Sequence, residues 1–116
     1  SPFFIVLLLW YPCYENLFSI IRKRILKRSP MTPDTNHFHQ LIFFFIKKRY
    51  KKKNLFANLI TAQIINIYHL IIFLVAVNYI KNSEIQISLI LLNITVYTII
   101  YFKTFLFKYN KGVKIL

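Results

Sequence analysis

The chain has 116 residues, 57% of them hydrophobic and one of them glycine, and it carries 16 Lys and Arg against 3 Asp and Glu, for a net charge of +13. Soluble proteins average roughly 45–50% apolar residues and about 7% glycine, so this composition argues against a water-soluble globular domain. The apolar content excludes a disordered polycation, and the single cysteine, Cys13, excludes a disulfide scaffold. An integral membrane protein with its charges collected in loops remains.

Three stretches are long enough to cross a bilayer, whose ~30 Å hydrocarbon core requires about 20 mostly apolar residues in a helix. They cover residues 2–21, 55–80 and 85–107, and the first contains Pro12 and Glu15. In lipid only helices and closed barrels satisfy their own backbone hydrogen bonds, and these runs lack the alternation of barrel strands. The sequence therefore predicts a single all-α membrane domain over residues 1–116 with three transmembrane helices.

The basic residues predict the orientation of these helices. Eleven lysines and arginines lie in the loop 22–54 and three more lysines lie in the tail 108–116, whereas the connector 81–84 is nearly neutral. Under the positive-inside rule the loop and the tail are cytoplasmic, and Ser1 and the connector face the other side.

The loop is expected to contain a short helix of its own. Pro30 and Pro33 stop the first helix, and Asp34 or Asn36 is the expected N-cap of a new helix that starts near His37. This segment combines an apolar run with a basic end and is too short to span. We therefore expect an interfacial helix at the cytoplasmic surface.

Two of the predicted spans carry a polar stripe at helical spacing. The stripes comprise Asn58, Ala62, Asn66, His69 and Ala76 in the second span, and Gln86, Asn93, Tyr97, Tyr101 and Thr104 in the third. Amides without partners are costly in lipid, so both stripes are expected to meet other helices. We interpret His69 as an interhelical hydrogen bonder rather than a proton relay.

The loop also places imidazoles beside many cations. His37 and His39 form a His-x-His pair, and Asp34 is a third conceivable metal ligand, but no cysteine or second carboxylate lies nearby to complete a metal site. Cations and imidazoles beside a helix N-terminus suit phosphate better than metal. The pattern therefore favours a phosphate-binding loop.

Motif residues lie on both sides of the turn between the first span and the short helix. They are Tyr11, Pro12, Glu15, Leu17, Phe18, Ser19, Ile20, Arg22 and Arg24, followed by Ser29, Pro30, Pro33, Asp34, His37, His39, Gln40, Leu41 and Ile42. This pattern resembles the C-terminal region of the bacterial glycosyltransferase family 4, the polyprenyl-phosphate N-acetylhexosamine-1-phosphate transferases. In that family a His-x-His(-His) motif, whose third position is Gln40 here, lies in the last large cytoplasmic loop before two final transmembrane helices.

The resemblance implies an enzyme of the bacterial inner (plasma) membrane. It transfers a sugar-1-phosphate from a UDP-N-acetylhexosamine to undecaprenyl phosphate, with Mg²⁺ present, and so initiates O-antigen or other cell-envelope polysaccharide synthesis. The phosphate-binding residues implied in this chain are His37, His39, Asp34, Arg22 and Arg24. The family's paired aspartates and its second catalytic aspartate lie upstream, so the chain is expected to be a C-terminal fragment that is inactive alone and holds no metal ligand. A homodimer is also compatible with this interpretation.

A second interpretation comes from the charges alone. A small basic membrane protein could bind anionic lipid or a partner subunit through this loop without any catalysis. Nucleic-acid binding is not expected, because the aromatic residues lie mostly inside the spans instead of alternating with cations in a groove.

Overall fold

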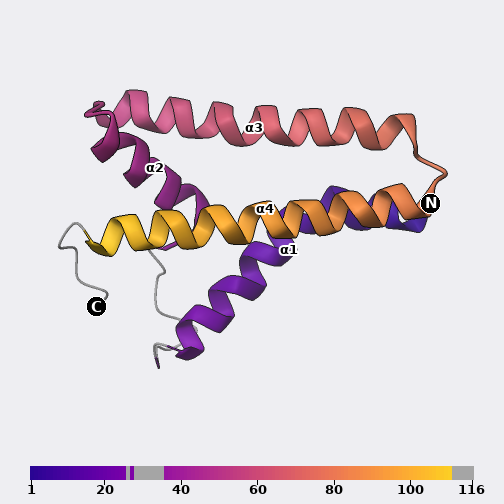
Figure 1. The fold of residues 1–116 in the computed structure, drawn as a ribbon, viewed down its shortest axis with the longest axis horizontal. Coiled ribbons are helices and arrows are strands. Elements are labelled where there is room, and N and C mark those ends of the chain that lie inside the picture. The colour runs from indigo at the N-terminus through magenta and orange to yellow at the C-terminus, as the bar shows by residue number, and fades with distance from the viewer. Residues whose placement is uncertain (26, 28–35, 111–116) are drawn as a thin grey trace.

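Four helices make up the part of the chain that the computed structural model describes, which is residues 1–25, 27 and 36–110. They are α1 (Pro2–Ile25), α2 (Phe38–Arg49), α3 (Asn54–Asn78) and α4 (Ser83–Asn110). Figure 1 shows α3 and α4 running antiparallel, with the short α2 beside one end of both and α1 against α4. The prediction of an all-α protein with three long apolar helices and a short one between the first two is confirmed.

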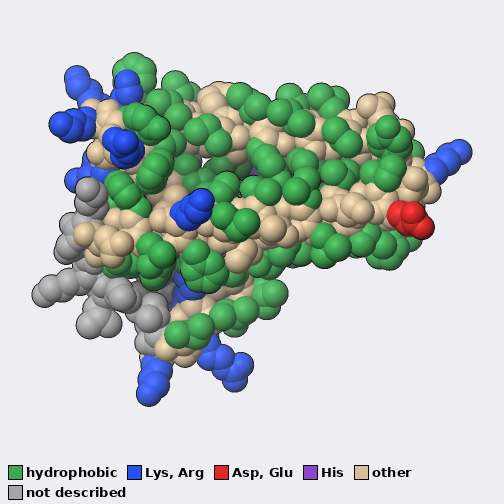
Figure 2. Space-filling view, viewed as in Figure 1, with side chains coloured by type: hydrophobic (Ala, Val, Ile, Leu, Met, Phe, Trp, Pro, Cys, Tyr) green, Lys and Arg blue, Asp and Glu red, His purple; other side chains and the backbone are tan. Residues whose placement is uncertain are grey.

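Helices α1, α3 and α4 are each long and apolar enough to cross a membrane. They contain 24, 25 and 28 residues, which at 1.5 Å per residue gives lengths of about 36–42 Å against a hydrocarbon core of ~30 Å. Apolar side chains cover the length of the molecule, whereas most Lys and Arg side chains gather at one end (Figure 2). The chain is therefore a multi-pass membrane protein.

The helix ends differ from the predicted ones by a few residues, for local reasons. Helix α1 continues to Ile25 because its last turn, Arg22–Arg24, is basic, and cations stabilise the negative end of the helix dipole. Helix α4 begins at Ser83, since the Asn82 side-chain oxygen accepts a hydrogen bond from the backbone N–H of Ile85 at 3.2 Å.

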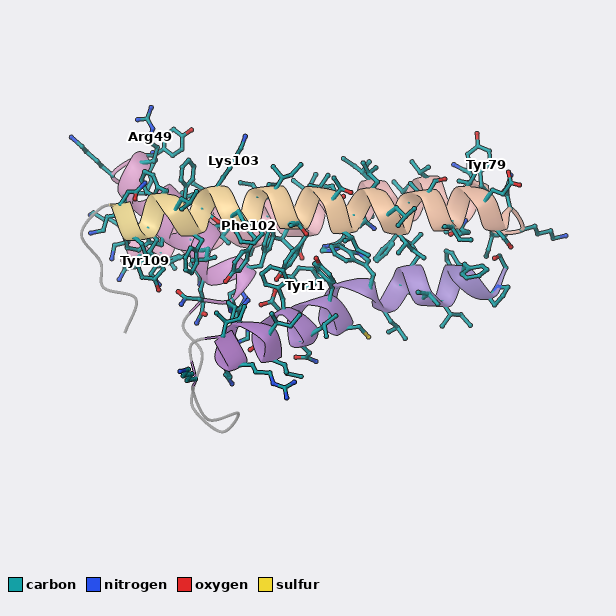
Figure 3. The ribbon with its side chains drawn as sticks, turned by 60° about the horizontal axis from the view of Figure 1, so that its bottom comes forward. Tyr11, Arg49, Tyr79, Phe102, Lys103 and Tyr109 are labelled. Carbon is teal, nitrogen blue, oxygen red and sulfur yellow. The ribbon has the colours of Figure 1, made fainter. Side chains whose placement is uncertain are left out.

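Helix α1 packs along α4 and bends away from it toward its C-terminal end (Figures 1 and 3). Pro12 lies inside α1, where it removes one backbone hydrogen bond and so permits the bend. At the other end, the Ser1 amine donates to the Ile80 carbonyl at 2.9 Å, and the hydroxyls of Ser1 and Ser83 lie 2.8 Å apart. These contacts fix the start of α1 to the turn between α3 and α4.

The polar stripe predicted for the third span is the buried face of α4. Its five residues, Gln86, Asn93, Tyr97, Tyr101 and Thr104, are the buried residues of this helix. Tyr97 packs edge-on against Tyr14 of α1, with ring centroids 4.9 Å apart, and Asn93 accepts a hydrogen bond from the Tyr68 hydroxyl of α3 at 2.6 Å. The prediction that this stripe faces other helices is confirmed.

Only part of the stripe predicted for the second span is buried, since Ala76 is buried and His69 is half-buried. The buried residues of α3 are Ala57, Thr61, Ile72 and Ala76, whereas Asn58, Ala62 and Asn66 are exposed. Helix α3 contacts chiefly α2. Contacts of Asn58 and Asn66 with further helices stay a prediction.

Helix α2 is buried between two spans as well as amphipathic. Phe38, Leu41, Ile42 and Ile46 are its buried residues, and the helix contacts both α3 and α4. Its last turn holds Lys47–Arg49, which lie at the same end of the molecule as Tyr109 of α4 (Figure 3). Packing of this apolar face therefore fixes the N-terminus of α2, where the two loop histidines lie.

One buried amide joins α3 to α4. Gln86 Nε2 donates to the carbonyls of Ala76 and Tyr79, both at 2.9 Å. Gln86→Leu is expected to lower the free energy of unfolding by about 1–2 kcal/mol, because two carbonyls at the end of α3 lose a donor. The measurement is unfolding by SDS in mixed micelles, followed by the fluorescence of Trp10, the single tryptophan. Ser88→Ala, which removes an exposed bond to the Glu84 carbonyl, is the control; an equal effect of both changes would contradict this role for Gln86.

Candidate functional site

A carboxylate lies inside the first span. Glu15 is buried in α1, with 8% of its surface exposed, although α1 is otherwise apolar until its basic last turn. Ionisable residues in membrane spans are costly and usually mark functional positions. Glu15 is part of the family-like pattern but is not among the predicted phosphate-binding residues, although a charge inside an apolar span was the signal that could have identified it.

Both oxygens of Glu15 accept hydrogen bonds from other helices. Oε1 lies 2.7 Å from His37 Nδ1 and accepts from the backbone N–H of Phe38 at 3.2 Å. Oε2 accepts from the Tyr97 hydroxyl of α4. The carboxylate thus joins α1, the start of α2 and the middle of α4.

Arg22 provides the counter-charge. It follows Glu15 by seven residues, which places both on one face of α1, and its Nη2 lies 3.8 Å from Glu15 Oε1. The guanidinium also lies over the rings of Phe18 and Tyr101, at 5.7 and 5.2 Å from their centroids. A buried carboxylate requires such compensation in a low-dielectric site. We call Glu15, Arg22, His37 and Tyr97 the Glu15 cluster.

Two of the predicted phosphate-binding residues stand side by side at the N-terminus of α2. The rings of His37 and His39 are nearly parallel, 8° apart, with centroids separated by 6.0 Å. His37 is partly exposed, with 29% of its side chain accessible, and His39 is exposed. Both imidazoles therefore lie where a ligand at the surface could reach them.

The other predicted site residues are placed differently. Arg22 belongs to the Glu15 cluster, with only 9% of its side chain exposed, whereas Arg24 is exposed at the end of α1. Asp34 lies outside the described residues. The structure therefore joins Arg22 to His37 through Glu15 and leaves Arg24 apart from them.

The expected N-cap residues of α2 do not cap it. His37 is the N-cap residue, and its backbone N–H donates to Gln40 Oε1 at 3.0 Å. Asn36, one of the two expected caps, instead accepts from Lys108 Nζ at 2.9 Å and from the Tyr109 hydroxyl at 3.0 Å. Asn36 is buried against the end of α4, and this tertiary contact takes the side chain that a local rule assigned to the helix start. The prediction of Asp34 or Asn36 as the cap is therefore wrong.

Metal ligands do not converge in this part of the chain. Among the described residues no group of three His, Cys, Asp or Glu side chains could hold a metal ion. Glu15 is already an acceptor at both oxygens, and Glu84 is exposed at the start of α4, by the α3–α4 turn. These residues do not fit the Mg²⁺ that the family resemblance implies, so we derive no step through a metal here.

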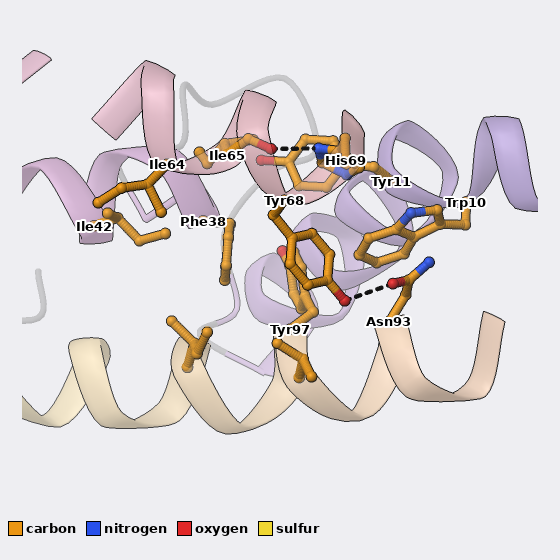
Figure 4. A pocket seen from close by; sticks show the side chains of 12 residues that line it. Trp10, Tyr11, Phe38, Ile42, Ile64, Ile65, Tyr68, His69, Asn93 and Tyr97 are labelled. Atoms are coloured by element: carbon orange, nitrogen blue, oxygen red, sulfur yellow. Dashed lines mark hydrogen bonds between the residues drawn. The ribbon is translucent and has the colours of Figure 1, made fainter. Parts of the chain in front are cut away.

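A cavity of about 90 Å³ lies next to the Glu15 cluster, between the four helices (Figure 4). Phe38 and Tyr97 form part of its wall, and their rings stack with centroids 4.3 Å apart. The rest of the wall is mainly aromatic and aliphatic, including Trp10 and Tyr11. Tyr97 therefore belongs both to the wall of the cavity and to the Glu15 cluster.

His69 also lines this cavity. Its Nδ1 donates to the Ile65 carbonyl at 2.9 Å, which is a bond within α3 (Figure 4). The ring lies between Tyr11 and Trp10 of α1, with centroids 5.0 and 5.7 Å away. The expected interhelical hydrogen bond is thus replaced by a bond to the preceding turn, and His69 meets α1 through ring contacts.

Comparison with protein-family models, with curated proteins and with solved structures finds no match to the chain.

Proposed function

We propose that the chain is the C-terminal part of a polyprenyl-phosphate N-acetylhexosamine-1-phosphate transferase. The observation that carries the proposal is the convergence of motif residues that are far apart in the sequence. Glu15 Oε1 of α1 lies 2.7 Å from His37 Nδ1 at the start of α2 and 3.8 Å from Arg22 Nη2 of α1. If these motif residues served only to set the membrane topology, those that are far apart in the sequence would not need to meet at one point.

In the proposed reaction a phosphate oxygen of undecaprenyl phosphate attacks the sugar-bearing phosphorus of a UDP-N-acetylhexosamine. The new P–O bond yields a lipid-diphosphate-linked sugar, and the bond to the bridging oxygen breaks, so that UMP leaves. Phosphoryl transfer is catalysed chiefly by positioning and by neutralising phosphate charge. His37 and His39 are the accessible imidazoles at the α2 N-terminus, where backbone N–H groups also favour a phosphate.

The catalytic aspartates and the Mg²⁺ that the resemblance implies belong to upstream parts of such an enzyme. The 116-residue chain alone is therefore proposed to be inactive, and its share is to hold phosphate. The direct test is formation of butanol-extractable lipid-linked sugar from radiolabelled UDP-N-acetylglucosamine and undecaprenyl phosphate by the enzyme that carries this chain. If the wild-type enzyme forms no lipid-linked sugar, the proposed function is wrong.

The alternative, a basic protein that binds anionic lipid without chemistry, is favoured by one observation. Lys51, Lys52 and Lys53, between α2 and α3, are all exposed. Cations next to a membrane are each worth about 1 kcal/mol of attraction to an anionic leaflet. This surface is separate from the Glu15 cluster, so lipid attraction explains these lysines but not the convergence of Glu15, Arg22 and His37.

The proposal places α2 and the basic loop on the cytoplasmic side of a bacterial plasma membrane. Cysteines at Lys48, in the last turn of α2, and at Lys81, between α3 and α4, are expected to label from opposite sides, and both positions are exposed. The background is Cys13→Ser, because Cys13 is exposed. A membrane-impermeant maleimide added to intact cells should label position 81 alone, and label at both positions would contradict the three-span topology.

A further inference from the structure

The Glu15 carboxylate determines which nitrogen of His37 is presented outward. The backbone N–H of Phe38 can only donate, so Oε1 is an acceptor in that bond. The Tyr97 hydroxyl donates to Oε2. A carboxylate has no proton to donate, so His37 Nδ1 is the donor in its 2.7 Å contact with Oε1. The proton therefore sits on Nδ1, and Nε2 is the ring nitrogen left for a ligand.

We infer that Glu15 is a positioning residue for phosphate recognition by His37, an inference that rests on the proposed function. The carboxylate holds the ring through Nδ1–H and the next peptide through Phe38 N–H, so that ring orientation and helix start are fixed by one group. Nε2 is then the nitrogen not bound to Glu15, on a ring whose side chain is 29% accessible and which lies parallel to the ring of His39. The orientation holds in either protonation state, because the Nδ1–H is present in both.

Four charged or polar groups face this carboxylate from the packed elements. Arg22 comes from its own helix, His37 and the Phe38 peptide come from the start of α2, and Tyr97 comes from α4. Tyr97 binds Oε2 alone, so the contact of His37 with Oε1 is separable from the rest of the cluster by substitution.

The ring orientation is measurable without any reaction. The chain contains three histidines, so ¹⁵N-histidine labelling in lipid nanodiscs gives few resonances, which His39→Asn and His69→Asn variants assign. In its neutral form, which the ¹⁵N resonances themselves identify, the His37 ring is expected to carry its proton on Nδ1. Tyr97→Phe should keep this tautomer, and Glu15→Leu should shift it toward the Nε2–H form that histidine favours in water. A wild-type His37 protonated on Nε2 would overturn the inference even if Glu15→Leu failed to fold.

The second test of the inference measures the transferase activity of the enzyme that carries this chain. Glu15→Leu is expected to lower kcat by roughly 10- to 100-fold, the usual effect of losing a carboxylate that orients a working histidine. Glu15→Gln keeps an acceptor oxygen for Nδ1–H and should retain more activity, and Glu84→Gln, at the opposite end, should be unchanged. If His37 is the Nδ1–H tautomer but the enzyme has no transferase activity, the proposed function is wrong and the inferred orientation of the His37 ring is still supported. Full activity of a folded Glu15→Leu variant would overturn the positioning role.

Discussion

His37→Ala is expected to lower sugar-1-phosphate transfer by roughly 100- to 1000-fold, whereas Lys52→Ala leaves it almost unchanged. A lost contact to transition-state charge costs about 3–4 kcal/mol. His37 lies at the N-terminus of α2, held by Glu15 at 2.7 Å, so its ring is fixed where a phosphate would bind. Lys52 is exposed in a run of three lysines, and its share of lipid attraction is only about 1 kcal/mol.

The comparison of these two variants uses the butanol-extraction assay, with protein levels matched in the membranes. The fluorescence of Trp10, whose ring lies 6.1 Å from that of Tyr97, reports whether the helices remain packed in each variant. Equal activity of two folded variants would mean that the histidine pair is structural, and the phosphate-binding role of His37 would have to be abandoned.

Arg22→Leu is expected to lower the free energy of unfolding by about 3–5 kcal/mol, the cost of leaving one partner of a buried ion pair without compensation. Arg22 and Glu15 are both nearly buried, with 9% and 11% of their side chains exposed. The substitution also removes the contacts of the guanidinium with the rings of Phe18 and Tyr101. Arg24→Leu provides the matched control, because Arg24 lies in the same turn of α1 but is exposed.

Unfolding by SDS in mixed micelles, followed by Trp10 fluorescence, measures both variants. The double variant Arg22→Leu, Glu15→Gln should recover part of the loss, since it also removes the buried charge that Arg22 compensates. Similar small effects of Arg22→Leu and Arg24→Leu would show that the Glu15 carboxylate does not depend on this guanidinium.

The spans were predictable because bilayer thickness imposes a length and an apolar character that can be read residue by residue. The buried face of α4 was predictable for the same kind of reason, since Gln86, Asn93 and Tyr97 share one side of any helix. The exposure of Asn58 and Asn66 on α3 was not, because it depends on where the other helices pack against α3. Sequence periodicity says which residues share a face but not which face a short third helix will occupy.

The site was predictable only in part. The sequence predicts His37, His39 and Arg22 as site residues, but it does not predict that Glu15 of the first span joins Arg22 to His37. Its contact with His37 crosses 22 positions and depends on how α2 packs against α3 and α4, which no local pattern encodes. The N-cap of α2 failed for a similar reason, since Asn36 binds Lys108 and Tyr109 at the far end of the chain.

The identity of the released nucleotide tests the central claim most directly. The enzyme carrying this chain is incubated with undecaprenyl phosphate and UDP-N-acetylglucosamine labelled in both the uridine and the sugar, and the products are separated by solvent extraction and chromatography. Sugar-1-phosphate transfer predicts one UMP released for each lipid-linked sugar, because the bond that breaks lies between the two phosphates. Release of UDP would mean transfer of the sugar alone, and labelled nucleotide release without a lipid product would mean hydrolysis. Either result would contradict the proposed function.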